Sequence, residues 1–278
     1  MSRRRDIEAG LRSLHGISEI LNAMKQMARV EVHRLGPFLA AQKRVVEGIE
    51  AAGADFAHFH SELFPADDSS EQACVLLGSE RGFCGDFNDS LLRALSGYGG
   101  KRFTRIVAIG SKLASKLPVE LAAARLDGAS VVEEVEGVLV NLMNTLVASD
   151  SRVSHRPLRV TVFHHQTERN AVQISVLYPF RRTGASPSHL PAPPRLYLDP
   201  VTFATGLVEQ YLFAWLHELI YGSLMVENQA RIERMDSALQ RLDKRSSDLL
   251  RRRNMLRQEE ITEEIEVIML TGPTLGRT

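Results

Sequence analysis

Apolar residues near the beginning of the chain recur at alternating steps of three and four positions. The pattern comprises Ile7, Leu11, Leu14, Ile17, Leu21, Met24 and Ala28, and it continues less regularly to Phe56. A narrow apolar stripe of this kind is typical of a helix that packs against another helix. We therefore predict a helical segment over residues 1–60. We expect Gly36-Pro37 to kink or locally break it, because proline lacks a backbone donor and clashes with the preceding turn.

The same spacing returns in the last part of the chain. It comprises Ile232, Met235, Leu239, Leu242, Ser246, Leu249, Arg253 and Leu256. Asp199-Pro200 fits a helix cap followed by a first turn, and the next proline is Pro273. We predict a second long helix over residues 199–270, which pairs with the first as an antiparallel coiled coil. Polar and charged residues should cover the outside of this pair.

The middle segment, residues 72–195, has a different pattern of apolar residues. Short runs rich in β-branched residues (ACVLLG, RIVAIG, LRVTVFHH and VQISVLYPF) alternate with helical stretches such as FNDSLLRALSGY and SVVEEVEGVLVNLMNTLVAS. This alternation indicates an α/β domain with a mainly parallel sheet. The proline-rich stretch 181–195 is typical of an exposed loop. The predicted fold is a long antiparallel coiled coil of N- and C-terminal helices with an inserted Rossmann-like α/β domain.

Composition and charge exclude several classes of protein. The chain has 34 Lys and Arg against 34 Asp and Glu, so no global field attracts nucleic acid or anionic lipid. The charge is uneven, because residues 241–257 are basic and residues 259–266 are acidic. Two cysteines are too few for a disulfide framework and lack metal-ligand spacing. No apolar run approaches the roughly 20 residues that span a bilayer, and no apolar stretch follows the basic N-terminus. We expect a soluble protein without a secretory signal, a metal or a cofactor.

The stretch SERGFCGDFN, residues 79–88, is the first candidate for chemistry. It is not a Walker A loop, because Asp86 and Phe87 follow Gly85 where lysine and a hydroxyl residue are required. Cys84 has no histidine nearby in the sequence, and Asp86 opposes formation of a thiolate. We interpret the stretch as a strand-to-helix turn whose glycines permit tight backbone geometry.

Three further features have structural interpretations. His164 and His165 occupy successive strand positions, so they point to opposite faces and cannot share a metal. Ser111, in the segment GSK after a predicted strand, fits a helix cap. The run Arg251–Arg253 fits a solvated helix face, or a surface that binds an acidic partner or RNA. These residues do not form an active-site constellation.

Five motifs together resemble one protein family. Residues Ile7, Leu11, Ser13, Leu14, Ile20, Ala23, Met24 and Ala28 follow the pattern I…I.SV…KIT.AM..VA, and SERGFCGDFN is similar to SDRGLCGGLN. IGSK at 109–112 also matches, and ENQARIERM and RQEEITEEIEVIMLTGP resemble SE…ARM.AM and RQA.IT.EI.EI..GA. On these motifs the chain resembles, over nearly its whole length, the γ subunit of the rotary F-type ATP synthases. It departs from the family pattern at Glu31, Glu80, Asp86, Glu259 and Glu260.

The resemblance implies a non-catalytic rotor subunit in the central stalk. Its partners would be the α, β and ε subunits and the membrane c-ring, with no bound nucleic acid and no direct membrane insertion. It would lie peripherally at the cytoplasmic face of the bacterial inner membrane. The coupling ion, proton or sodium, stays open. The inserted cysteine segment of the chloroplast form is missing, so no thiol switch is expected.

The resemblance also implies positions that contact partners. Arg231, Gln258 and Thr262 match residues that bind a loop of the β subunit, and Met24 matches a position near an acidic lever segment of β. Tyr197, in LYLDP, resembles a position that contacts the membrane ring. Two alternatives remain open: a non-rotary coiled-coil adaptor with an α/β head, and an α/β hydrolase or transferase that uses Cys84.

Overall fold

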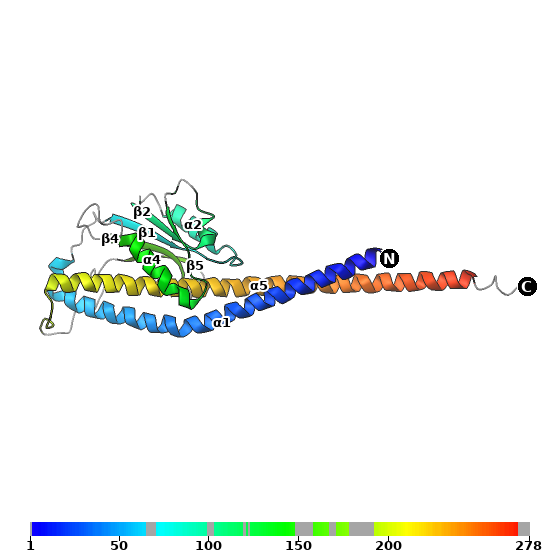
Figure 1. Ribbon diagram of the computed structural model, residues 1–278, viewed down its shortest axis with the longest axis horizontal. Helices are drawn as coiled ribbons and strands as arrows, with labels where there is room; N and C mark the ends of the chain where they lie inside the picture. The colour runs from blue at the N-terminus through cyan, green and yellow to red at the C-terminus, as the bar shows by residue number, and fades with distance from the viewer. Residues whose placement is uncertain are drawn as a thin grey trace, which may run out of the picture. The chain divides into compact units, whose positions relative to one another are not determined.

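A computed structural model describes residues 2–64, 71–98, 103–118, 121, 123–147, 158–166, 171–177 and 192–271 (Figure 1). The chain divides into two compact units, which comprise residues 1–27 with 232–278, and residues 28–231. Two long helices, α1 (Ser2–Phe59) and α5 (Pro200–Thr271), contribute to both units. Most of the predicted loop 181–195, and also Pro273, lie outside the described residues.

The larger unit contains a five-stranded sheet in the order β3-β2-β1-β4-β5. The strands are β1 (Glu71–Leu77), β2 (Arg105–Ile109), β3 (Ala123–Leu126), β4 (Leu158–Gln166) and β5 (Ala171–Leu177). The first four are parallel, and β5 runs antiparallel to β4. The prediction of an α/β fold with a mainly parallel sheet is therefore confirmed. Of the five described strands, β3 was not predicted, because its sequence AARL carries no β-branched residue.

Helices cover both faces of this sheet. Helix α2 (Phe87–Gly97) and the short α3 (Ser111–Ala114) pack on the face that includes Cys74 and Leu76. The other face, which includes Val75 and Val162, is covered by α4 (Val135–Val147) and by parts of α1 and α5. Short 3₁₀ turns, η1 (Ser61–Leu63) and η2 (Val132–Glu134), follow α1 and precede α4. This three-layer arrangement buries residues on both sides of every central strand.

Within the larger unit, α1 and α5 pack along each other and against the sheet. Leu35, Leu39 and Val46 of α1 share one apolar cluster with the α5 residues from Tyr211 to Met225. Gln42 Nε2 donates to the carbonyl oxygen of Ala214 at 2.9 Å, and the Tyr211 hydroxyl donates to Glu50 at 2.6 Å. These two polar contacts fix the register of the pair.

Gly36-Pro37 does not break the helix, and the kink expected there stays a prediction. Helix α1 continues from Ser2 to Phe59 with Pro37 inside it. Pro37 and His33, the residue whose carbonyl loses its helical donor, are both exposed. The carbonyl oxygen can therefore bond to water, and the buried neighbours Leu35 and Leu39 hold the helix on its other side.

In the smaller unit, the two helices form an antiparallel pair. Lys25 bonds to Asp236 at 2.7 Å and Arg4 bonds to Glu260 at 3.1 Å, so residue numbers fall along α1 as they rise along α5. All eight predicted seam positions of α5 are buried or half-buried. On α1 the predicted stripe is wrong at Ile17, which is 45% exposed and lies at the edge of the contact.

A close approach of β1 to α3 generates a stability prediction. A Cβ atom added at Gly78 would overlap the Cβ of Leu113, which is fully buried. We expect Gly78→Ala to lower the free energy of unfolding by about 2 kcal/mol, because either the backbone or Leu113 must shift. Gly48→Ala is the matched control: nothing lies within 4 Å of a Cβ there, and alanine favours the helix. Denaturant unfolding of the full chain measures both, and equal effects would contradict the prediction.

Candidate partner-binding surfaces

The segment between β1 and α2, residues 79–86, is a turn held by its own polar groups. The Ser79 amide donates to Asn88 Oδ1 at 3.0 Å, and Asn88 Nδ2 donates to Ser79 Oγ at 2.8 Å. Two residues in the segment have positive φ: Gly85, which tolerates it, and Phe83 at 64°. The interpretation of SERGFCGDFN as a strand-to-helix turn agrees with this geometry, since α2 begins at Phe87.

Cys84 lies inside this turn. It is 7% exposed, and its Sγ donates to Ser79 Oγ at 3.2 Å. Burial raises the pKa of the Cys84 thiol, although the Ser79 hydroxyl opposes the shift. A buried thiol with a raised pKa is a weak nucleophile, which argues against the hydrolase or transferase alternative.

The turn is clamped to α5 by a buried polar network. Arg231 Nε donates to the carbonyl oxygen of Gly82 at 3.2 Å, and the Arg231 guanidinium forms an ion pair with Glu227 and donates to Asn228 Oδ1. The Arg81 amide donates to Glu227 Oε1 at 3.3 Å. Glu227, Asn228 and Arg231 are each at most 5% exposed. Burial raises the pKa of Glu227, although the Arg231 guanidinium and the Arg81 amide oppose the shift.

The network gives Arg231 an internal role that sequence reasoning missed. Its guanidinium is occupied by groups of the same chain, and its contact with a β-subunit loop stays a prediction. The spacing of Glu227 and Arg231, one helical turn apart, signals an ion pair in the sequence. It does not signal that the pair is buried or that the partner across the fold is Gly82.

Gln258 and Thr262 lie on the exposed surface of α5, in the smaller unit. The Thr262 hydroxyl donates back to the carbonyl oxygen of Gln258 at 2.9 Å. Both residues line an open groove of about 360 Å³. Met24, in the same unit, is half-buried in the seam. Tyr197, in the larger unit, is fully exposed just before α5, whose first turn is capped by the Asp199 carboxylate on the Thr202 amide at 2.9 Å.

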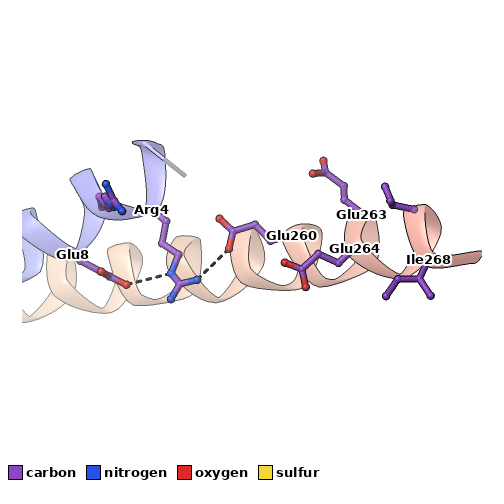
Figure 2. A pocket seen from close by; sticks show the side chains of 8 residues that line it. Arg4, Glu8, Glu260, Glu263, Glu264 and Ile268 are labelled. Atoms are coloured by element: carbon purple, nitrogen blue, oxygen red, sulfur yellow. Dashed lines mark hydrogen bonds and ion pairs between the residues drawn. The ribbon is translucent and has the colours of Figure 1, made fainter. Parts of the chain in front are cut away.

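The last turns of α5 expose apolar side chains. They include Ile261, Ile265, Val267, Ile268, Met269 and Leu270, each at least 45% exposed. The expectation that polar residues cover the outside of the helix pair is therefore wrong here. Figure 2 shows Arg4 of α1 reaching Glu8 and Glu260. These three residues line a second open groove, of about 810 Å³, together with Glu263, Glu264 and Ile268.

The prediction that Ser111 caps a helix is wrong, because Ser111 is the first residue of α3 and its amide bonds to Glu80. Helix α3 begins at Ser111, after Gly110 at φ 104°, and no side chain caps it from the Gly110 position. Instead, the Glu80 carboxylate accepts hydrogen bonds from the Ser111 amide at 2.9 Å, from the Ser111 hydroxyl, and from the Gly128 amide at 2.7 Å. Burial opposes ionisation, yet these bonds lower the pKa of Glu80. The carboxylate thus ties together the segments that follow β1, β2 and β3.

The two histidines of β4 point to opposite faces, as predicted. His165 stacks on Phe87 with ring centroids 3.9 Å apart, and its Nε2 lies 3.0 Å from Ser90 Oγ on α2. The Nε2 of His164 lies 2.9 Å from Ser175 Oγ on β5. Burial lowers the pKa of both imidazoles, and that of His165 falls to about 4. Among the described residues, no group of three His, Cys, Asp or Glu is arranged to hold a metal ion.

Two long helices pair antiparallel in each unit, and an α/β domain is inserted between them in the sequence. The chain therefore belongs to the class of proteins that combine a long antiparallel helix pair with an inserted α/β domain. A family model described as ATP synthase matches residues 3–271. The chain is 24% identical to the ATP synthase gamma chain of Clostridium beijerinckii over 95% of each chain. It is 23% identical to that of Heliobacterium modesticaldum over 98% of this chain and 99% of the relative.

Solved structures share the fold. A chain of the Euglena gracilis mitochondrial ATP synthase rotor superposes with a TM-score of 0.65 at 14% identity, covering 94% of this chain and 99% of that chain. This protein belongs to the ATP synthase gamma-chain family, whose members are non-catalytic subunits. Within the described residues, no helix has the length and apolarity that crossing a membrane requires.

The lowered pKa of His165 predicts acid sensitivity. The imidazole of the unfolded chain takes up a proton near pH 6.5, whereas that of the folded chain takes it up near pH 4. Stability from this group is therefore present above pH 6.5 and is lost as the pH falls toward 4, by about 3 kcal/mol. His165→Gln should reduce this loss of unfolding free energy, which denaturant unfolding at several pH values measures. His58→Gln, at an exposed position, should leave it unchanged.

The buried ion pair predicts an asymmetric mutational response. Arg231→Met should lower the free energy of unfolding by about 3 kcal/mol, because it leaves the Glu227 carboxylate buried without its cation. Adding Glu227→Leu should restore much of the loss, since no buried charge then remains. Arg245→Met, at an exposed position on α5, is the control and should change stability by less than about 0.5 kcal/mol. A double variant less stable than Arg231→Met alone would contradict this account.

Proposed function

We propose that this chain is the central-stalk rotor subunit of an F-type ATP synthase. It couples ion flow through a membrane ring to ATP synthesis or hydrolysis at the α and β subunits. Its partners are the α, β and ε subunits and the c-ring. It lies peripherally at the cytoplasmic face of the bacterial inner membrane. The residues that contact β are Gln258, Thr262, Met24 and Arg231, and the residue that contacts the ring is Tyr197.

The observation that carries this proposal is the end of the helix pair in the smaller unit. Arg4 bonds to Glu260, and the apolar residues of α5 that follow Glu264 are each more than half exposed. Side chains such as Ile268 and Leu270 stay in contact with water in the free chain. An exposed apolar helix end of this size supports a partner that encloses it.

The same unit is suited to transmit torque. Its apolar seam runs from Met24 to Ile7 on α1, and ion pairs lie near both ends, at Lys25–Asp236 and Arg4–Glu260. Interdigitated side chains oppose sliding of one helix along the other. The similar solved structures come from a mitochondrial ATP synthase rotor and from an assembly of OSCP, F1 and c-ring, which supports the proposed partners.

Removal of residues 259–278 tests the proposal. In the complex purified from the native host, we expect the truncated chain to leave ATP hydrolysis measurable but to lower ATP-driven ion pumping per ATP hydrolysed. The reason is that the exposed apolar end and Thr262 no longer engage the catalytic subunits. Cys84→Ser is the control, because serine retains the hydrogen bond to Ser79, and it should leave pumping unchanged.

The outcomes separate the alternatives. A non-rotary adaptor predicts that the tagged chain recovers proteins other than α, β and ε subunits. Turnover by the isolated chain that Cys84→Ser abolishes would indicate an enzyme. Normal coupling after the truncation would contradict the role given to the end of α5.

A further inference from the structure

The carboxyl ends of β1, β2 and β3 lie together at one edge of the sheet, because these strands run parallel. Backbone hydrogen bonds join the segments that follow the strands. The Gly78 amide donates to the carbonyl oxygen of Ile109 at 2.9 Å, and the Lys112 amide donates to that of Ser79 at 3.1 Å. A Cβ atom added at Gly110, whose φ is 104°, would lie 2.6 Å from the Ser79 carbonyl oxygen. These segments therefore contact one another through their backbones.

Glu80 connects this edge of the sheet to helix α5. Its carboxylate binds the amides of Ser111 and Gly128, which belong to the segments after β2 and β3. The next residue, Arg81, donates its amide to the buried Glu227 carboxylate of α5 at 3.3 Å. Glu80 therefore lies between a contact with α5 on one side and a contact with the segment after β3 on the other.

The segment after β3 leads to helix α1. The Val132 amide, at the start of η2, donates to the Glu31 carboxylate of α1 at 3.4 Å. Arg34, one turn further along α1, pairs with Glu31 at 3.5 Å and with Glu133 of η2. Val132 is also buried in the apolar cluster that contains Leu35 of α1. Polar and apolar contacts therefore both attach this segment to α1.

The contacts with the two long helices lie at the same end of the larger unit. This unit begins at Ala28 on α1 and ends at Arg231 on α5, so Glu31 and Glu227 each lie within about one helical turn of its boundary. Apolar contacts are not directional, whereas hydrogen bonds to charged groups hold their partners in one geometry. The edge of the sheet is therefore suited to set the relative orientation of α1 and α5 at this point.

We propose that these contacts form a brace that fixes the relative orientation of α1 and α5, and that Glu80 is the positioning residue at its centre. The brace comprises Glu227, Arg81, Glu80, Gly128, Val132 and Glu31. The inference deepens the proposed function and rests on it, because a rotor transmits torque without loss only if its two helices turn together. The α/β domain then adds a second connection between the helices, beside their direct packing.

Hydrogen exchange of the full chain tests the brace without any partner. In Glu80→Ala, the amides of Ser111 and Gly128 lose their acceptor and should exchange faster. The brace predicts more: the Arg81 and Val132 amides, which bond to other carboxylates, should also exchange at least about tenfold faster. Acceleration confined to Ser111 and Gly128 would show that Glu80 acts only locally and would overturn the brace.

The controls separate positioning from general stability. Asp127→Ala removes an exposed carboxylate from the segment that contains Gly128, and it should leave all four amides unchanged. The amides of β4, such as that of Val162, report on the whole fold, and an equal acceleration there would overturn the positioning role. Glu80→Gln retains one acceptor oxygen and should accelerate the same four amides about threefold. It carries the test if Glu80→Ala does not fold.

A double-mutant cycle tests whether Glu80 connects the two helices. Glu31→Ala, on α1, should accelerate exchange of the Arg81 amide, which bonds to α5. In the Glu80→Ala background the same change should have no further effect on the Arg81 amide, because the connection is already broken. An equal effect of Glu31→Ala in both backgrounds would overturn the central position of Glu80.

The complex purified from the native host links the brace to coupling. Glu80→Ala should lower ATP-driven ion pumping per ATP hydrolysed about twofold, whereas Asp127→Ala should not. If the unchanged chain supports no ATP-driven pumping, the proposed function fails, and the exchange measurements still decide the brace. Normal pumping with Glu80→Ala, despite faster exchange of the Arg81 and Val132 amides, would overturn the contribution of the brace to torque.

Discussion

Burial of the middle of α5 on more than one side is the constraint on which the larger unit depends. Leu224 and Met225 belong to the apolar cluster shared with α1 and α4, whereas Val226 belongs to the cluster under α2 and α3. The helix therefore joins both layers of the core. A helix buried nearly all round leaves no solvated face for polar residues, so any that remain must find partners inside the protein.

Glu227, Asn228 and Arg231 are the polar residues at this point, and they meet the requirement by bonding to one another and to the turn after β1. A buried charge pair is weak evidence for stability, because desolvation offsets the attraction between the charges. Its value here is geometrical. The network holds a turn of the α/β domain against a helix 149 residues away in the sequence, and this defines where the turn's exposed side chains lie.

Pattern and composition were sufficient to predict the long helices and most of the sheet. The stripe on α5 follows from the spacing of its apolar residues, and β1, β2, β4 and β5 follow from short runs rich in β-branched residues. The exceptions involve information that spacing does not contain. Pro37 is accommodated because its free carbonyl lies on the exposed side, and β3 forms because β2 offers an edge, not because AARL favours a strand. The partner of Arg231 is set by tertiary packing.

The carboxylate of Glu80 has a consequence for how this protein relates to nucleotides. In open α/β sheets, ligand phosphates bind at the carboxyl edge of the strands, where backbone N–H groups point outward. Here the amides of Ser111 and Gly128 already bond to a carboxylate of the same chain. A phosphate approaching this edge would meet occupied donors and a negative charge. The domain thus keeps the strand order of a nucleotide-binding fold, but the Glu80 carboxylate occupies the amides that a phosphate would otherwise bind.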